Sequence, residues 1–153
     1  MHKPFTKDKK GFTIIEVLIV LAIAGLILLI VFLSVPALQR NSRNTTKKAE
    51  ASAIGGAIAE WANNHNGILP TSGAEQTEAL TYAKLQTYNG NVTWGAGAQV
   101  ALPAASVDAA KVVTRAKCNP NGDGSTLAGA NRGVAVQYMV ETSGAPQAMC
   151  YES

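Results

Sequence analysis

A long apolar run near the start of the chain constrains the possible folds more than any other feature. Residues 12–35 contain only three polar side chains, those of Thr13, Glu16 and Ser34. At about 1.5 Å per residue, a helix of this length would reach about 36 Å, whereas the hydrocarbon core of a bilayer is about 30 Å thick. We therefore predict that residues 12–35 form a membrane-spanning helix and that the more polar remainder forms a water-soluble body.

The charged side chains are concentrated on both sides of this run. Residues 1–11 contain four lysines and one aspartate, which account for the formal net charge of +3. Beyond residue 48, eight acidic groups outnumber five basic ones, so the net charge is no direct evidence for nucleic acid binding. A basic cluster also follows the apolar run, and we expect each member to lie on a solvated helix face; the members are Arg40, Arg43, Lys47 and Lys48.

A short motif marks the junction between the basic segment and the apolar run. It reads Gly11-Phe12-Thr13-Ile14-Ile15-Glu16, with a small residue at the junction and a carboxylate just inside the apolar segment. Together with the apolar helix that follows, this motif resembles the N-terminal signature of type IV pilins and of the related type II secretion pseudopilins. The resemblance covers roughly the first third of the chain.

The resemblance implies a processing pathway and a set of partners. A prepilin peptidase would remove residues 1–11 as a leader peptide by cutting after Gly11, and the new Phe12 amine would be methylated. Glu16 would act in filament assembly. The partners would be further copies of the chain in a helical homopolymer, a pilus assembly ATPase and its membrane platform.

The same resemblance implies a location and a biological role. The leader would lie inside the cell and the body outside. The chain would therefore begin as a single-pass precursor in the inner (cytoplasmic) membrane and end in an extracellular type IV pilus. Such a pilus would serve adhesion, twitching motility or DNA uptake.

Three alternatives to this role remain open. The chain could be a pseudopilin that acts in a type II secretion system, or a signal-anchored surface binding domain that never polymerises. It could also carry an ordinary secretory signal cleaved after Ala24, because Ala22-Ile23-Ala24 fits the small-x-small pattern. That cleavage would leave an apolar segment exposed at the new terminus, which argues against it.

Catalytic chemistry finds little support in the sequence. The only histidines are His2 in the leader and His65 between asparagines, and neither lies near a plausible nucleophile in the sequence. Metalloprotease, phosphate-loop, nucleophile-elbow and CxxC motifs are lacking in the sequence. We therefore predict a structural protein rather than an enzyme, with no cofactor.

One loop partly imitates a calcium-binding sequence. Asn119, Asn121 and Asp123 occupy the first ligand positions of such a loop, but Ala130 stands where a bidentate Glu would be expected. A Gly/Asn/Asp turn is the favoured interpretation. Bound calcium at these three residues is kept as a hypothesis.

Two cysteines, Cys118 and Cys150, lie in the predicted outer body. An even number of cysteines in an exported domain favours a disulfide over two buried thiols. Closing a loop of this length would stabilise the fold by about 3–4 kcal/mol in the loop-closure picture.

The remaining pattern predicts an α+β fold like that of pilins. The helix continues through residues 36–66, with Ile54, Ile58 and Trp61 on one apolar stripe and Gly67 as its stop. Residues 67–153 would form the globular head. Strands are expected at 111–117, 133–141 and 147–151, in a small antiparallel sheet packed on the second half of the helix. Residues 71–103 are interpreted as a loose loop region, with a possible short helix over 80–88.

Overall fold

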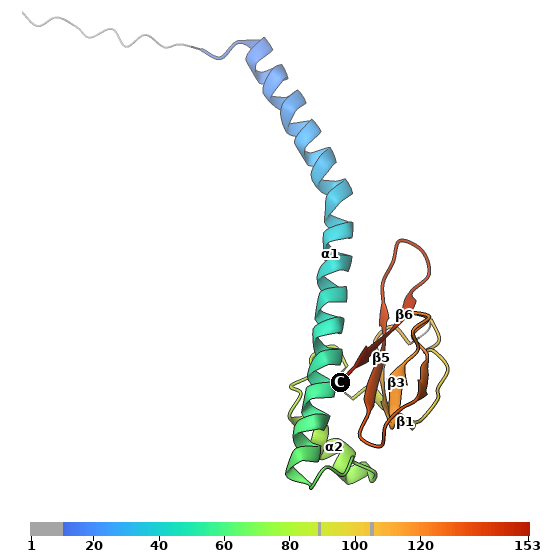
Figure 1. Cartoon of the computed structure of the whole chain (residues 1–153). Helices are drawn as coiled ribbons and strands as arrows, with labels where there is room; N and C mark the ends of the chain where they lie inside the picture. Colours follow the sequence, from blue (N-terminus) through green and yellow to red (C-terminus); the bar gives the residue numbers. More distant parts are fainter. Residues whose placement is uncertain (1–10, 89, 105) are drawn as a thin grey trace, which may run out of the picture. The chain divides into compact units, whose positions relative to one another are not determined.

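The computed structural model describes residues 11–88, 90–104 and 106–153, so residues 1–10 of the predicted leader lie outside it. The described part contains two helices, α1 (Ile14–Asn64) and α2 (Gly73–Thr81). It also contains strands β1 (Val92–Ala96), β2 (Ala110–Thr114), β3 (Ala116–Cys118), β4 (Thr126–Ala128), β5 (Val134–Val140) and β6 (Gln147–Glu152) (Figure 1). The chain divides into two compact units, the first ending at Leu38 and the second comprising Gln39–Ser153.

The first unit is the N-terminal part of α1, and it has no buried side chain among residues 11–38. An 18-residue window of α1 has a mean hydropathy of 3.3, so α1 is long and apolar enough to cross a membrane. Pro36 lies inside the helix, which continues through it. The Ser34 hydroxyl donates to the Ile30 carbonyl at 2.9 Å, a common way to satisfy a hydroxyl on an apolar helix. The predicted apolar helix is confirmed.

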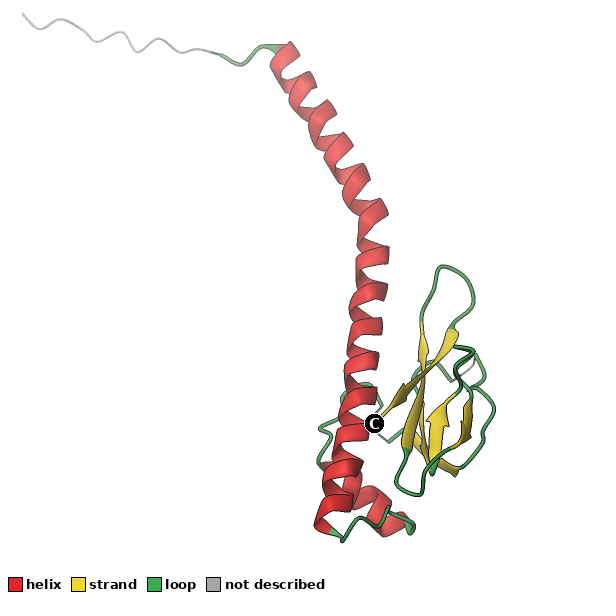
Figure 2. Ribbon diagram, viewed as in Figure 1, coloured by secondary structure: helices red, strands yellow, loops and turns green. Residues whose placement is uncertain are grey.

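The second unit is built on the rest of α1, which lies beside the sheet (Figure 2). One stripe of side chains on this part of α1 is buried against the sheet. Ile54, Ile58 and Trp61 are at most 2% exposed, which confirms the predicted stripe. The facing residues come from the central strands and alternate along them; they are Val112, Val134, Val136 and Tyr138.

The main sheet has the strand order β1-β2-β5-β6. β5 pairs antiparallel with β2 and with β6, as predicted, and Val136 lies opposite both Val112 and Tyr151. β1 was not predicted and pairs parallel with β2. The α+β fold is confirmed, although the sheet is therefore mixed rather than wholly antiparallel.

The loop region predicted over residues 71–103 is more ordered than expected. Its helix, α2, begins after Ser72 and ends before residues 82–88, so the helix expected over 80–88 is misplaced. The physical reason is a capping box: the Ser72 hydroxyl accepts from the Glu75 N–H at 3.3 Å, and Glu75 Oε2 accepts from the Ser72 N–H at 2.9 Å. Backbone hydrogen bonds from Ser72 and Thr71 lower the pKa of Glu75 to about 2.

The strand expected over residues 111–117 is broken in two by Arg115. This residue has a φ of 55°, which turns the chain out of the first sheet. β2 therefore pairs with β5, whereas β3 pairs antiparallel with β4 in a separate two-stranded sheet. Cys118 at the end of β3 forms a disulfide with Cys150 in β6, with the Cα atoms 5.7 Å apart. The predicted disulfide is confirmed and joins the two sheets.

The end of α1 follows the predicted signal. Gly67 has a φ of 80°, and its N–H donates to the Ala62 carbonyl at 2.7 Å, so the left-handed stop at this glycine is confirmed. His65 stacks on Trp61 with ring centroids 3.8 Å apart, and its Nδ1 donates to the Trp61 carbonyl at 2.8 Å. These contacts give His65 a structural role at the helix end.

Candidate functional site

The predicted processing junction lies directly before α1. Gly11, Phe12 and Thr13 precede the first helical residue, and Phe12 is 89% exposed. A Cβ atom added to Gly11 would meet no other atom within 4 Å. The fold of the described residues therefore does not require glycine at this position, and any requirement for it would come from an enzyme that acts on the junction.

Thr13 and Glu16 form a reciprocal cap on the first turn of α1. The Thr13 N–H and hydroxyl both donate to Glu16 Oε2, at 2.9 and 2.7 Å. The Glu16 N–H approaches the Thr13 hydroxyl oxygen at 3.4 Å. This is a capping box, and the Thr-x-x-Glu spacing that signals it is present in the sequence. Thr13 is thus a capping residue whose role sequence reasoning missed.

The helix beyond this cap presents an apolar surface on all sides. Large apolar side chains are exposed throughout the first unit, for example Leu29 at 62% and Phe32 at 75%. Such a surface is unstable in water, because monomeric soluble proteins rarely expose apolar patches of this size. It requires lipid or other apolar surfaces as its surroundings.

These features coincide with a known family motif. The family model for the prokaryotic N-terminal methylation motif matches residues 6–32. The chain carries the signal motif of type IV pilins and pseudopilins. No curated protein and no solved structure matches the chain. The methylation motif and the apolar helix fit a membrane-anchored precursor, and the motif indicates a structural protein.

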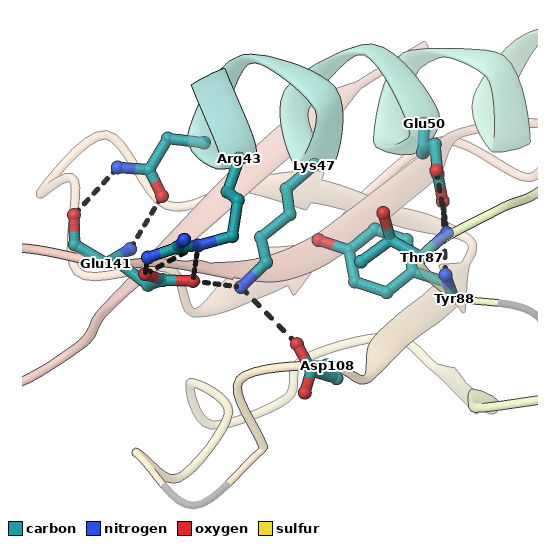
Figure 3. A network of polar contacts seen from close by, with 8 residues as sticks. Arg43, Lys47, Glu50, Thr87, Tyr88, Asp108 and Glu141 are labelled. Atoms are coloured by element: carbon teal, nitrogen blue, oxygen red, sulfur yellow. Dashed lines mark hydrogen bonds and ion pairs between the residues drawn. The ribbon is translucent and has the colours of Figure 1, made fainter. Parts of the chain in front are cut away.

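The basic cluster after the apolar run is not a uniformly solvated face, so that expectation is wrong for Lys47. Its side chain is only 2% exposed, and its Nζ lies 3.3 Å from Glu141 Oε1 and 3.6 Å from Asp108 Oδ1 (Figure 3). Arg43 reaches the same Glu141 carboxylate, with Nη2 to Oε2 at 2.6 Å. Hydrogen bonds from Arg43, followed by those from Lys47, lower the pKa of Glu141 to about 2.

Backbone contacts reinforce this cluster at the end of β5. The Asn44 side chain donates to the Glu141 carbonyl at 2.7 Å and accepts from the Glu141 N–H at 2.7 Å. Arg40 Nη1 donates to the Thr142 carbonyl at 3.1 Å. We call residues 40–47 of α1 with Glu141 and Thr142 the neck clamp. It fastens the β5–β6 turn to α1 within the second unit.

A buried carboxylate, that of Glu50 in α1, holds the chain between α2 and β1. Glu50 is buried, and its oxygens accept from the N–H groups of Gln86, Thr87 and Tyr88 at 2.8–3.2 Å. Burial raises the pKa of Glu50, but these hydrogen bonds outweigh burial and the net pKa lies below its ordinary value. The hydrogen-bonding capacity of Glu50 is therefore used within its own fold.

The loop that imitates a calcium site is internally hydrogen bonded. Asn119 Oδ1 accepts from the Asn121 N–H at 3.2 Å, and Asp123 Oδ1 accepts from the Ser125 N–H and hydroxyl at 2.8 and 2.5 Å. Within the described residues, no three His, Cys, Asp or Glu side chains gather as a possible metal site. These contacts support the turn interpretation, and calcium binding at this loop stays an untested hypothesis.

Proposed function

We propose that this chain is the precursor of a type IV pilus subunit that polymerises through its N-terminal helix. The observation that carries the proposal is the methylation motif at residues 6–32, which includes the N-terminal part of α1, where every apolar side chain up to Leu38 is exposed. Cutting after Gly11 would free the Phe12 amine at the end of that helix. The membrane would then cover the apolar surface before assembly, and the helices of other subunits would cover it afterwards.

Glu16 is the residue through which we propose that a new subunit is recruited. A carboxylate inside a membrane span costs about 2.5–3.5 kcal/mol on insertion scales, so its presence in this run calls for a function. The amine of an incoming Phe12 is the complementary charge, and charges attract strongly where water is scarce. Both capping bonds from Thr13 end on Oε2 of Glu16. Oε1 could therefore accept an amine from a neighbouring subunit while the cap stays intact.

A pseudopilin of a type II secretion system is the second candidate, because the matched motif is that of both groups. The two candidates differ in where the mature chain is found. A pilus subunit is recovered from fibres sheared off the cell surface. A pseudopilin stays with the cell envelope, and its loss blocks protein secretion instead of removing surface fibres.

Mass spectrometry of sheared surface fibres tests the proposal. We expect the chain in the fibres, beginning at methylated Phe12 and linked through Cys118 and Cys150. Fibres that contain the chain with residues 1–11 still attached would contradict the processing step. Absence of the mature chain from fibres, together with a secretion defect on its deletion, would replace the pilus by the pseudopilin.

A further inference from the structure

A groove in the second unit lies between α2 and the edge strand β1. Its volume is about 600 Å³, within the range of about 300–1,000 Å³ that is typical of small-molecule sites. We call it the α2–β1 groove, and its principal lining residues are Gln76, Thr77, Leu80, Lys84, Val92 and Trp94.

Three segments around the groove, namely α2, residues 86–88 and β1, are held in place by contacts outside it. On one side, the capping box of Ser72 and Glu75 fixes the first turn of α2. On the other side, the buried Glu50 carboxylate accepts hydrogen bonds from three consecutive backbone N–H groups, those of residues 86–88. The third element, β1, is paired with β2 along its length. The groove is therefore largely preformed, which reduces the entropy lost when a ligand binds.

The lining divides into an apolar floor and a polar rim. Leu80, Val92 and Trp94 are half-buried and pack on the hydrophobic core. On the rim, the hydroxyls of Thr77 and Thr81 donate to backbone carbonyls, at 2.8 and 2.6 Å, so their oxygens can still accept hydrogen bonds. An indole beside hydrogen-bond acceptors suits a ligand with an apolar ring face and hydroxyl donors at its edge, as in a saccharide.

The charge of the groove further restricts the class of ligand that it can bind. Among the described residues that line it, none carries a carboxylate, and Lys84 is the one charged residue. Lys84 is exposed, forms no ion pair within the described part of the chain, and has a φ of 47°, a conformation that favours glycine. A lysine held in this sparsely populated conformation beside a cleft is the kind of local strain found at binding sites.

We propose that the α2–β1 groove binds an acidic saccharide. The sugar ring packs on the floor that contains Trp94, its hydroxyls donate to the rim oxygens, and its carboxylate pairs with Lys84. This site goes beyond the proposed filament role, because a single subunit is sufficient for binding. Loss of polymerisation would leave the binding intact, and loss of binding would leave the filament intact.

Calorimetry on the full-length chain tests the proposal. The chain is solubilised in a detergent without a sugar headgroup, and trigalacturonate is the acidic probe. Its fully methyl-esterified form keeps the sugar and removes the charge, whereas tricarballylate keeps three carboxylates and removes the sugar. We expect binding of trigalacturonate at least tenfold tighter than that of either control, because a hydrogen bond to a charged group is worth about that factor. Binding of either control as tight as that of trigalacturonate, or no binding of trigalacturonate, would overturn the proposal.

Matched variants locate the binding in the groove. Lys84→Met removes the charge, Thr81→Val removes a rim hydroxyl, and Lys117→Met removes an exposed lysine from β3, outside the groove. We expect Lys84→Met to weaken binding about tenfold, and Lys117→Met to leave it unchanged. The urea midpoint of each variant shows that it is folded. A folded Lys84→Met variant that binds as tightly as the Lys117→Met variant would overturn the assignment of Lys84.

Discussion

The neck clamp makes a prediction whose size can be derived from its contacts. Glu141→Gln keeps the shape of the side chain but removes the charge that faces Lys47 at 3.3 Å. Removing one partner of a fully buried pair costs about 3–5 kcal/mol, because the other charge stays buried. Here Asp108 remains 3.6 Å from Lys47, and the Glu141 side chain is 22% exposed, so solvent and a second carboxylate offset part of that cost. We expect a loss of about 2–3 kcal/mol in the free energy of unfolding.

Urea unfolding of the full-length chain in detergent, followed by tryptophan emission, measures this loss. The midpoint should fall by about 1–2 M for a domain of this size. Lys47→Met is the matched control, because it removes the buried cation and leaves Glu141 paired with Arg43. A buried charge pair is often replaced by apolar side chains at little cost, so this variant should lose less stability than Glu141→Gln. Equal losses in the two variants, or no loss in Glu141→Gln, would refute the reasoning.

The difference in stability between wild type and Glu141→Gln should depend on pH, with a defined sign. The pKa of Glu141 is lowered to about 2 from an ordinary value of 4.5. Its contribution is therefore fully present above pH 4.5 and is lost as the pH falls from 4.5 towards 2. The pKa values of Glu50 and Glu75 are also lowered, so acid weakens the wild type through several groups. The difference between wild type and Glu141→Gln isolates Glu141, and it should shrink over this interval.

The N-terminal segment and the disulfide yield three further predictions. Glu16→Ala should insert and be cleaved but give few or no filaments. The control Thr13→Val removes the capping hydroxyl, keeps the carboxylate and should still assemble. Electron microscopy of surface fibres distinguishes the two variants, and assembly of Glu16→Ala equal to that of Thr13→Val would contradict charge recruitment. Gly11→Leu should block cleavage, seen as retained precursor on immunoblots, without changing the urea midpoint of the second unit, because the fold has open space there. Cys118→Ser or Cys150→Ser should lower the free energy of unfolding by about 2–4 kcal/mol. Equal free energies of unfolding of the non-reduced wild type and either variant would count against that estimate.

The elements that could be predicted from the sequence are those with a local signal. Ile54, Ile58 and Trp61 repeat at helical spacing, and β5 alternates at the spacing of a strand, so both were found in the right place. α2 also has a local signal, the Ser72-x-x-Glu75 capping box, but the apolar spacing of Leu80, Leu85 and Tyr88 points to a later helix. The Thr13–Glu16 cap has the same kind of local signal.

Other features had no local signal. β1 pairs with a strand that follows it by more than a dozen residues, and a parallel pairing cannot be inferred from either strand alone. Lys47 was expected in solvent because lysines are rarely buried unless paired, and its partner Glu141 lies 94 residues further along the chain. Arg115 breaks a convincing alternation through its backbone conformation, which the side-chain pattern does not reveal.

The hydrogen bonds of the charged groups indicate which of them can act between copies of the chain. Glu50 and Glu141 are satisfied by groups of the second unit, and a neighbour could recruit them only by breaking those contacts. Glu16 differs, because its local partner Thr13 occupies one carboxylate oxygen and its surroundings are apolar. Substitutions in the neck clamp should therefore change the stability of the head, whereas substitution of Glu16 should change assembly. A Glu141 variant that folds as stably as wild type yet fails to polymerise would break this division.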